Sequence, residues 1–203
     1  MPSLKDIRKR ISSVKNTQKI TRALKLVSAA KLNRAQREMS RLKPYAEKQR
    51  ELVQGLVGEL GDSPSPLFEA RSEVNTVAVL VICSDRGMCG GFNSSVVKML
   101  KRFAAERSDA GQELACFSLG RRATQAVKKL GLTLTEDLGE VLRPDLMDDV
   151  SRITQHLITQ YQAGEFDQVY ILSNRFINAI NQSPESRVFL PICLLYTSPS
   201  PRD

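Results

Sequence analysis

Residues 7–32 read IRKRISSVKNTQKITRALKLVSAAKL, and they lie in a run from Ser3 to Leu42 that contains neither glycine nor proline. Apolar residues recur along this run every three or four positions, which is the spacing of one face of an α-helix. The pattern predicts one helix of about forty residues, roughly 60 Å long. The apolar stripe consists of Leu4, Ile7, Ile11, Val14, Ile20, Leu24, Val27, Ala30, Ala35, Met39, Leu42 and Ala46.

Both ends of this helix carry signals. Ser3 precedes the first apolar residue and Asp6 follows three positions later, which predicts an N-cap with an acidic first turn. Pro44 predicts a bend. Beyond it the apolar pattern resumes and then fades among glycines, at Val53, Gly55, Leu56, Gly58, Leu60 and Gly61.

The stripe is narrow, of coiled-coil type, and it shifts sideways near Gln18. A long helix of this kind is held mainly by packing its apolar face on another helix. The other helices that the sequence predicts are at most about 20 residues long. We therefore expect the companion helix to come from another chain, or from a C-terminal part of this protein that the sequence lacks.

Charge is unevenly distributed along the chain. Residues 1–50 hold 15 of the 30 Lys and Arg and three acidic residues, a net charge of +12. The remaining residues hold 15 basic and 19 acidic side chains, a net charge of −4. A basic helical arm on a mildly acidic body predicts an acidic partner, which the charge alone leaves open as nucleic acid, anionic lipid or an acidic protein surface.

Ser-Pro-Ser-Pro at 63–66 marks a boundary, so we expect one domain at 1–62 and a globular domain at 63–192. The second part alternates strand and helix patterns and ends in an antiparallel hairpin that turns at 182–185. This α/β pattern predicts a Rossmann-like, mainly parallel sheet with helices on its faces. The strands are expected at 74–83, 113–119, 132–135, 166–180 and 187–192, and the helices at 93–107, 121–130 and 144–163.

The segment CSDRGMCGG, residues 83–91, lies between an expected strand and an expected helix, where α/β proteins often bind phosphates. Its glycine spacing matches neither GxGxxG nor GxxxxGK[ST]. We interpret it as a structural turn, with nucleotide binding or a Cys83–Cys89 redox pair as the alternatives. The two thiols are six residues apart and lack the CxxC form.

No other residues form a catalytic or metal-binding pattern in the sequence. The one histidine, His156, is expected to be an ordinary helical side chain, and Ser94 and Ser95 lack an identifiable base. Asp145, Asp148 and Asp149 are expected to stabilise the first turn of a helix. Four scattered cysteines and a single histidine do not predict a zinc site, so we expect no metal and no cofactor.

Three blocks of the sequence together resemble the gamma subunit of the rotary ATP synthase. They are residues 7–32, the segment SDRGMCGGFN at 84–93, and FDQVYILSNRFINAI at 166–180. The resemblance covers residues 1–192. It implies a non-catalytic central stalk whose N-terminal helix pairs with a long C-terminal helix and turns inside a hexamer of alpha and beta subunits.

The resemblance also implies partners and contact residues. The globular domain would touch the epsilon subunit and the ring of c subunits, and would associate with a membrane only indirectly. With no presequence pattern, we expect the cytoplasmic side of a bacterial plasma membrane. The expected contacts with the hexamer are Lys19, Arg22, Leu24, Lys25, Leu26 and Val27. Residues of the glycine-rich segment are expected to be structural: Asp85, Arg86, Gly87, Gly90 and Gly91.

The last segment, CLLYTSPSPRD at 193–203, does not resemble this family, and we expect it to be foreign to the natural protein. Two other functions compete with the stalk. A nucleic-acid-binding protein would use the basic arm, but the arm has no aromatic residue before Tyr45 with which to stack bases. An enzyme would hold a nucleotide on residues 83–91.

Overall fold

The structure is a computed structural model, and it describes residues 3–60, 65–141 and 146–192. The chain divides into two compact units, residues 1–61 and 62–203. Several expectations fall outside the described residues: the end of the first helix at Gly61, the start of the linker at 63–64, the first helical positions Pro144 and Asp145, and the whole segment 193–203 with Cys193.

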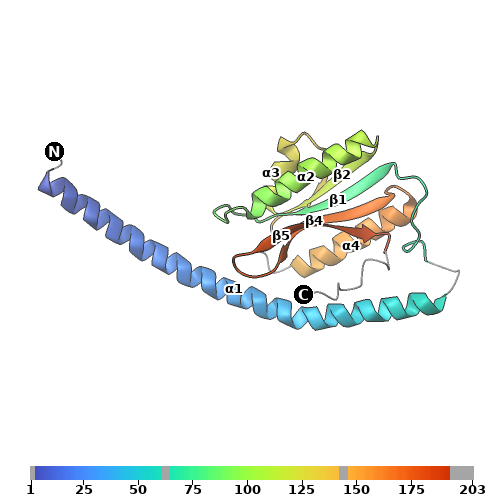
Figure 1. Cartoon of the computed structure of the whole chain (residues 1–203), viewed down its shortest axis with the longest axis horizontal. Coiled ribbons are helices and arrows are strands. Elements are labelled where there is room, and N and C mark those ends of the chain that lie inside the picture. The colour runs from blue at the N-terminus through green and yellow to red at the C-terminus, as the bar shows by residue number, and fades with distance from the viewer. Residues whose placement is uncertain (1–2, 61–64, 142–145, 193–203) are drawn as a thin grey trace. The chain divides into compact units, whose positions relative to one another are not determined.

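The first unit is a single helix, α1, which spans Leu4–Leu60 (Figure 1). The predicted N-cap is confirmed, because Ser3 Oγ accepts a hydrogen bond from the backbone N–H of Asp6 at 3.3 Å. The backbone N–H and hydroxyl of Ser3 donate in return to the Asp6 carboxylate. Pro44 lies inside the helix without ending it, so α1 extends well beyond the run from Ser3 to Leu42 that lacks glycine and proline.

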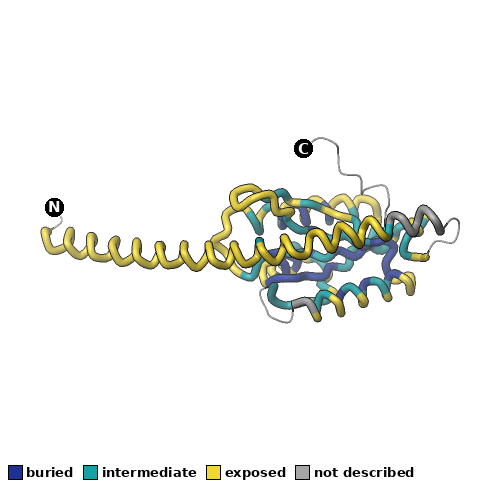
Figure 2. The backbone as a smooth tube through the Cα atoms, turned by 90° about the horizontal axis from the view of Figure 1, so that it is seen from below, coloured by how far each residue is buried: buried dark blue, intermediate teal, exposed yellow. Residues whose placement is uncertain are grey.

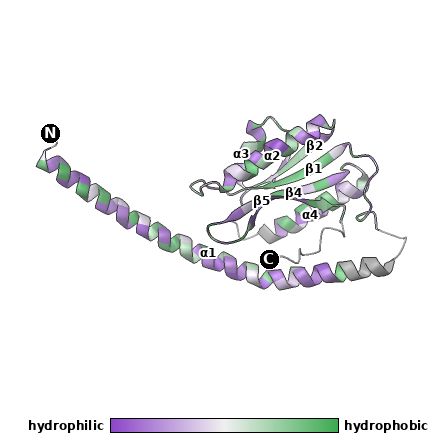
Figure 3. Ribbon diagram, in the orientation of Figure 1, coloured by the Kyte–Doolittle hydropathy of each residue, from purple (hydrophilic) through white to green (hydrophobic). Residues whose placement is uncertain are grey.

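Large apolar side chains of α1 are exposed from Leu4 to Leu52. Ile7, Ile20 and Leu24 are 43%, 61% and 58% exposed, and Figure 2 shows the exposed class over nearly the whole described helix. Figure 3 shows hydrophobic and hydrophilic residues alternating along it. Within the described residues, the apolar stripe has nothing packed over it.

The second unit is built on a five-stranded sheet in the order β3-β2-β1-β4-β5. The strands are β1 (Thr76–Ile82), β2 (Glu113–Leu119), β3 (Leu134–Asp137), β4 (Gln168–Phe176) and β5 (Gln182–Leu190). The first four run parallel, and β5 pairs antiparallel with β4. The expected mainly parallel sheet with a late hairpin is confirmed.

Helices cover both faces of the sheet, as Figure 1 shows. One face packs against α2 (Phe92–Asp109) and α3 (Arg121–Lys129), and the other against α4 (Leu146–Ala163). Successive residues of β1 alternate between these two cores: Val77, Val79 and Val81 join the first, and Ala78 joins the second. Burial on both faces explains why β1 is an unbroken apolar run.

The hairpin turn was misplaced by the sequence pattern. The chain turns at 177–181 rather than at 182–185, and Gln182–Leu190 is strand. Asn178 forms the turn, because its side-chain oxygen accepts hydrogen bonds from the backbone N–H groups of Ile180 and Asn181. The apolar Ile177 and Ile180, which suggested a continuing strand, are exposed. Pro184 is tolerated in β5 because β5 is an edge strand.

The helices α2 and α3 and the strand β2 match their predicted ranges to within two residues. Among the described residues, no helix combines the length and the apolar character that a membrane span requires.

Candidate functional site

The six residues expected to contact a hexamer lie on two different faces of α1. Lys19, Arg22 and Lys25 are three residues apart and share one face, and Leu26, seven residues after Lys19, lies among them. Leu24 and Val27 continue the apolar stripe from Ile20 instead. In the described part of the chain, none of the three cations forms an ion pair with an acidic residue.

The glycine-rich segment lies at the carboxyl edge of the parallel strands, and its polar groups are bonded to one another. The Asn93 side chain accepts from the Ser84 backbone N–H at 3.0 Å and donates to the Ser84 hydroxyl at 2.8 Å. It also donates to Cys89 Sγ at 3.1 Å. The Ser84 hydroxyl donates to the Arg86 carbonyl at 2.6 Å. The side-chain amide of Asn93, the second residue of α2, therefore holds the loop closed.

Asp85 connects the same loop to two other elements. Its carboxylate accepts from the backbone N–H of Val141 at 3.1 Å and from that of Arg121, the first residue of α3, at 3.3 Å. A carboxylate at a helix N-terminus is stabilised by the helix dipole. Of the three glycines singled out in the sequence, Gly90 has a positive φ of 57°, whereas Gly87 and Gly91 do not.

The glycine with the strictest requirement lies outside that segment. Gly120, between β2 and α3, has φ 95°, and a Cβ atom there would lie 2.1 Å from the Cys83 carbonyl oxygen. The one feature of the sequence that could have indicated this special conformation is the position of Gly120 between an apolar strand and a helix. The backbone of Gly120 thus passes directly against the carbonyl of Cys83, the residue that follows β1.

A cavity of about 460 Å³ lies between this loop and the β4–β5 turn. None of the residues that line it is charged: Cys89, Gly90, Gly91, Phe92, Phe176, Ala179, Ile180 and Gln182. The lining therefore offers a phosphate group no cationic side chain, in contrast to what phosphate recognition usually uses.

The two cysteines of the segment have different surroundings. Burial, with a smaller effect from Cys89, raises the pKa of the Cys83 thiol to about 11, while Cys89 is exposed. Burial also raises the pKa of Cys116 to about 12. Because the thiolate is the reactive form, Cys83 and Cys116 are unreactive thiols at neutral pH.

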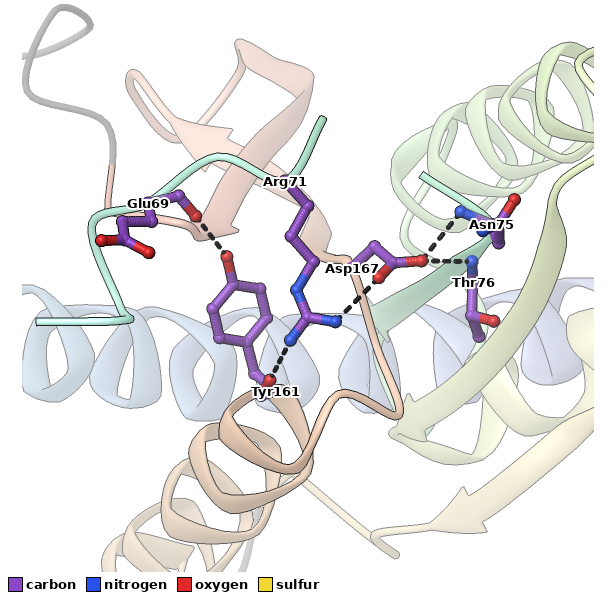
Figure 4. Close-up of polar contacts among 6 residues, drawn as sticks. All are labelled: Glu69, Arg71, Asn75, Thr76, Tyr161 and Asp167. Carbon is purple, nitrogen blue, oxygen red and sulfur yellow. Dashed lines mark hydrogen bonds and ion pairs between the residues drawn. The ribbon is translucent and has the colours of Figure 1, made fainter. Parts of the chain in front are cut away.

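A charged cluster that sequence reasoning missed joins three segments at the opposite, amino edge of the sheet (Figure 4). Arg71 donates to the Asp167 carboxylate at 2.9 Å and to the Tyr161 carbonyl at 2.6 Å. The other Asp167 oxygen accepts from the backbone N–H groups of Asn75 and Thr76 at 2.8 and 2.9 Å. No sequence motif marks this cluster, because Arg71 and Asp167 are 96 residues apart.

The electrostatics of the cluster favour the ionised carboxylate. Burial alone would raise the pKa of Asp167, but the hydrogen bonds from Thr76 and Asn75, together with Arg71, outweigh it and hold the pKa below its ordinary value. Burial raises the pKa of Tyr161, against the opposing effect of Arg71. The cluster is therefore an ionised, hydrogen-bonded structure at neutral pH.

The remaining candidates are held in ordinary contacts. His156 is half-buried on α4, with its ring 6.1 Å from that of Phe117. Ser95 donates to the Asn174 side chain, and Ser94 to the Gly91 carbonyl. Asp148 and Asp149 lie in the first turn of α4. Across the described ranges, no three His, Cys, Asp or Glu side chains gather as metal ligands.

Comparison with known proteins gives a consistent result. A protein-family model described as ATP synthase matches residues 3–200. The chain is 38% identical over 194 residues to the ATP synthase gamma chain of Flavobacterium psychrophilum, covering 95% of this chain and 66% of that one. It is 36% identical to the gamma chain of Chlorobaculum tepidum, covering 95% and 67%. The chain thus spans about two thirds of the length of these curated relatives.

Chains in solved structures have a fold similar to that of this chain. A chain in the central stalk and c-ring of the Tetrahymena thermophila mitochondrial ATP synthase matches with a TM-score of 0.59 and 23% identity, covering 85% of this chain and 72% of that one. A chain in the rotor of the Euglena gracilis mitochondrial enzyme matches with a TM-score of 0.54 and 16% identity, covering 90% and 61%. The presence of a long helix and of a five-stranded α/β unit, the family match and the sequence identity agree: the chain belongs to the ATP synthase gamma chain family.

Proposed function

We propose that this chain works as the gamma subunit of a rotary ATP synthase. As the central rotor stalk, it would couple proton flow through the membrane sector to ATP synthesis and hydrolysis in the alpha–beta hexamer. The observation that carries this proposal is α1 itself, a 57-residue helix whose apolar stripe is exposed along its length, in a member of the gamma chain family. A helix that exposes such a stripe requires a companion helix.

The companion that fits is a second long helix from a further C-terminal part of the gamma subunit, wound antiparallel on α1. Leu24 and Val27 lie on the stripe, so they belong to this helix pair. Lys19, Arg22, Lys25 and Leu26 lie on another face and remain available to the hexamer. This division refines the set of six contact residues that the sequence suggested.

Lys19, Arg22 and Lys25 form a basic face of α1, and this face suits a contact that changes as the stalk rotates. Exposed cations that lack acidic neighbours on their own helix attract an acidic surface on a beta subunit, and such charges mainly set the rate and register of association. As the stalk turns, its asymmetric surface meets three beta subunits in succession. Each surface must bind one beta conformation better than another, because only a difference in affinity shifts a conformational equilibrium.

The α/β unit serves as the foot of the stalk, against the epsilon subunit and the ring of c subunits. Asp85, Arg86, Gly87, Gly90 and Gly91 shape the loop that joins β1 to α2, and they carry no catalysis. The chain itself is non-catalytic and uses no cofactor. It is peripheral to the bacterial plasma membrane on the cytoplasmic side and is held there through its partners.

Reconstitution tests the proposal. The full-length natural chain is mixed with alpha and beta subunits of a bacterial relative, and ATP hydrolysis and probe rotation are measured. We expect a stable complex that rotates a probe attached to the α/β unit. Absence of a complex, together with tight salt-sensitive retention of unrelated DNA on a filter, would instead support the nucleic-acid-binding alternative.

Charge-reversal variants test whether the position of these cations, and not only the net charge of the chain, determines the rate of association with the hexamer. Reversing Lys19, Arg22 and Lys25 together to Glu is expected to slow association with the hexamer about tenfold or more at low salt, and the difference should shrink as salt rises. The matched control reverses three exposed cations of α2, Lys98, Lys101 and Arg102, which changes the net charge equally. Equal slowing in both variants would show that only net charge matters.

A further inference from the structure

The segment that leads from α1 to the sheet is short, and part of it is fastened to the α/β unit. After Leu60, the last residue of α1, residues 61–64 precede Ser65, and β1 begins at Thr76. Any twist that travels along the backbone between the helix and the sheet passes through residues 65–75. The firmness with which residues 65–75 are held therefore determines how much twist reaches β1.

The Arg71 cluster holds this segment at several points (Figure 4). Arg71 reaches the start of β4 through Asp167 and the last turn of α4 through the Tyr161 carbonyl. Its guanidinium also lies over the Tyr161 ring, 5.1 Å from the ring centre. In return, the Tyr161 hydroxyl donates to the Glu69 carbonyl at 2.9 Å. Both sides of Arg71 in the sequence are thus bonded to the body of the unit.

The same segment is fixed further along in both directions. The Asp167 carboxylate binds the backbone N–H groups of Asn75 and Thr76, and the Asp167 backbone N–H donates to the Thr76 carbonyl at 2.8 Å. Near the start of the segment, the Leu67 carbonyl accepts from the backbone N–H of Ile192 at 2.7 Å. Leu67 also packs against the core on the α4 side of the sheet.

The burial of the Arg71–Asp167 pair distinguishes it from the surface ion pairs. Its side chains are 31% and 13% exposed, whereas in every other ion pair between described residues at least one side chain is more than half exposed. Exposed pairs contribute little, but a partly buried pair with additional hydrogen bonds resists separation. Removing Arg71 would also leave a buried carboxylate without its cation.

We infer that Arg71 is a positioning residue for torque transfer: it fastens residues 65–75 to β4 and α4, so that the segment turns with the sheet as one body. Without that attachment, the segment would be an irregular chain whose backbone dihedrals could absorb twist. With it, twist applied to the α/β unit is carried along the backbone from the sheet to Ser65. This inference rests on the proposed stalk function and adds a residue that transmits the rotation.

The test uses the full-length natural chain, free and assembled with alpha and beta subunits. Arg71→Met removes the charge and the hydrogen bonds but keeps an apolar stem. Arg152→Met is the matched control, because it breaks an exposed ion pair with Glu136 in the same unit. Arg71→Lys keeps the charge but cannot serve Asp167 and the Tyr161 carbonyl with one planar group.

Two measurements read out the attachment. In the free chain, we expect Arg71→Met to speed amide hydrogen exchange of residues 67–76 about tenfold or more, with β2 unchanged. In the complex, the angular fluctuation of a probe on the α/β unit should widen at least twofold in variance while each complex still hydrolyses ATP. Arg152→Met should alter neither, and Arg71→Lys should fall between.

The outcomes separate the two proposals. If wild-type complexes rotate and Arg71→Met leaves the angular variance unchanged, Arg71 has no part in torque transfer, while the stalk function stands. If Arg71→Met only lowers the yield of complexes without widening the fluctuation, its role is structural and the inference fails. If the wild-type chain does not assemble or rotate, the stalk function fails and the torque role fails with it.

Discussion

Replacement of Gly120 by alanine tests how the carboxyl edge of the sheet is built. Gly120 has φ 95° and ψ 137°, a conformation available essentially only to glycine, and an alanine forced into it is strained by about 1–3 kcal/mol. The added Cβ would lie 2.1 Å from the Cys83 carbonyl oxygen and 3.1 Å from Val141 Cγ2. Backbone cannot yield as a flexible side chain does, so the β1 end or the start of α3 must move.

That movement would disrupt local hydrogen bonds. The Cys83 N–H donates to the Leu119 carbonyl at 3.0 Å, the Gly120 N–H to the Gly139 carbonyl at 2.8 Å, and the Arg122 N–H to the Ser84 carbonyl at 3.2 Å. Each contributes about 1 kcal/mol. Losing two of them in addition to the strain lowers the free energy of unfolding by about 4 kcal/mol, which is exceptional for one substitution.

Equilibrium unfolding in urea, followed by near-UV circular dichroism, measures this effect. At a slope of about 2 kcal/mol per M, the midpoint should fall by about 2 M. Gly131→Ala is the matched control: its φ is also positive, at 70°, but a Cβ there meets nothing within 4 Å. It should lose only about 1–2 kcal/mol. Equal losses in the two variants would refute the close approach at Gly120.

Three further outcomes follow from the local chemistry. At pH 7.5, a maleimide should label Cys89 in the native chain, whereas Cys83 and Cys116 should react only after unfolding. Mass spectrometry of digested protein identifies the labelled peptides. Rapid labelling of Cys83 in the native chain would contradict its burial. Because Asp167 has a lowered pKa in the folded chain, its contribution is complete above the ordinary value of 3.8 and is lost as the pH falls through the lower folded value. Asp167→Asn should therefore lower the free energy of unfolding by about 2 kcal/mol at pH 7. In urea titrations, the difference from the wild type should shrink between about pH 5 and pH 2. A difference that stayed constant over this range would disprove the ion pair. Ser3→Ala should lower the stability of α1 by about 1 kcal/mol, seen as loss of ellipticity at 222 nm on heating, while Ser3→Asp should restore it.

Local pattern predicted much of the second unit. The strand at Glu113–Leu119 and the helix that begins at Arg121 lie where the pattern places them, because alternation of side chains and glycine stops act over a few residues. The hairpin turn was misplaced because Ile177 and Ile180 look like strand residues, whereas the Asn178 side chain bonds the turn and leaves them exposed. Apolar character predicts burial only on average.

The attachments of the α/β unit were not predictable in the same way. The sequence indicated that residues 83–91 form a turn, but not that Asp85 bonds Val141, 56 residues away. Nor did it indicate that Gly120 passes against Cys83. Such contacts depend on which strands become neighbours, and strand order is a property of the whole sheet.

For α1, the amino-acid sequence by itself determined the helix, its cap, its basic charge and its exposed apolar stripe, because each depends on residues within one or two turns of each other. Only the tertiary structure decided how the α/β unit is fastened. The Arg71–Asp167 pair and the Gly120–Cys83 contact join residues 96 and 37 positions apart. They exist because the parallel strands bring their amino ends to one edge of the sheet and their carboxyl ends to the other.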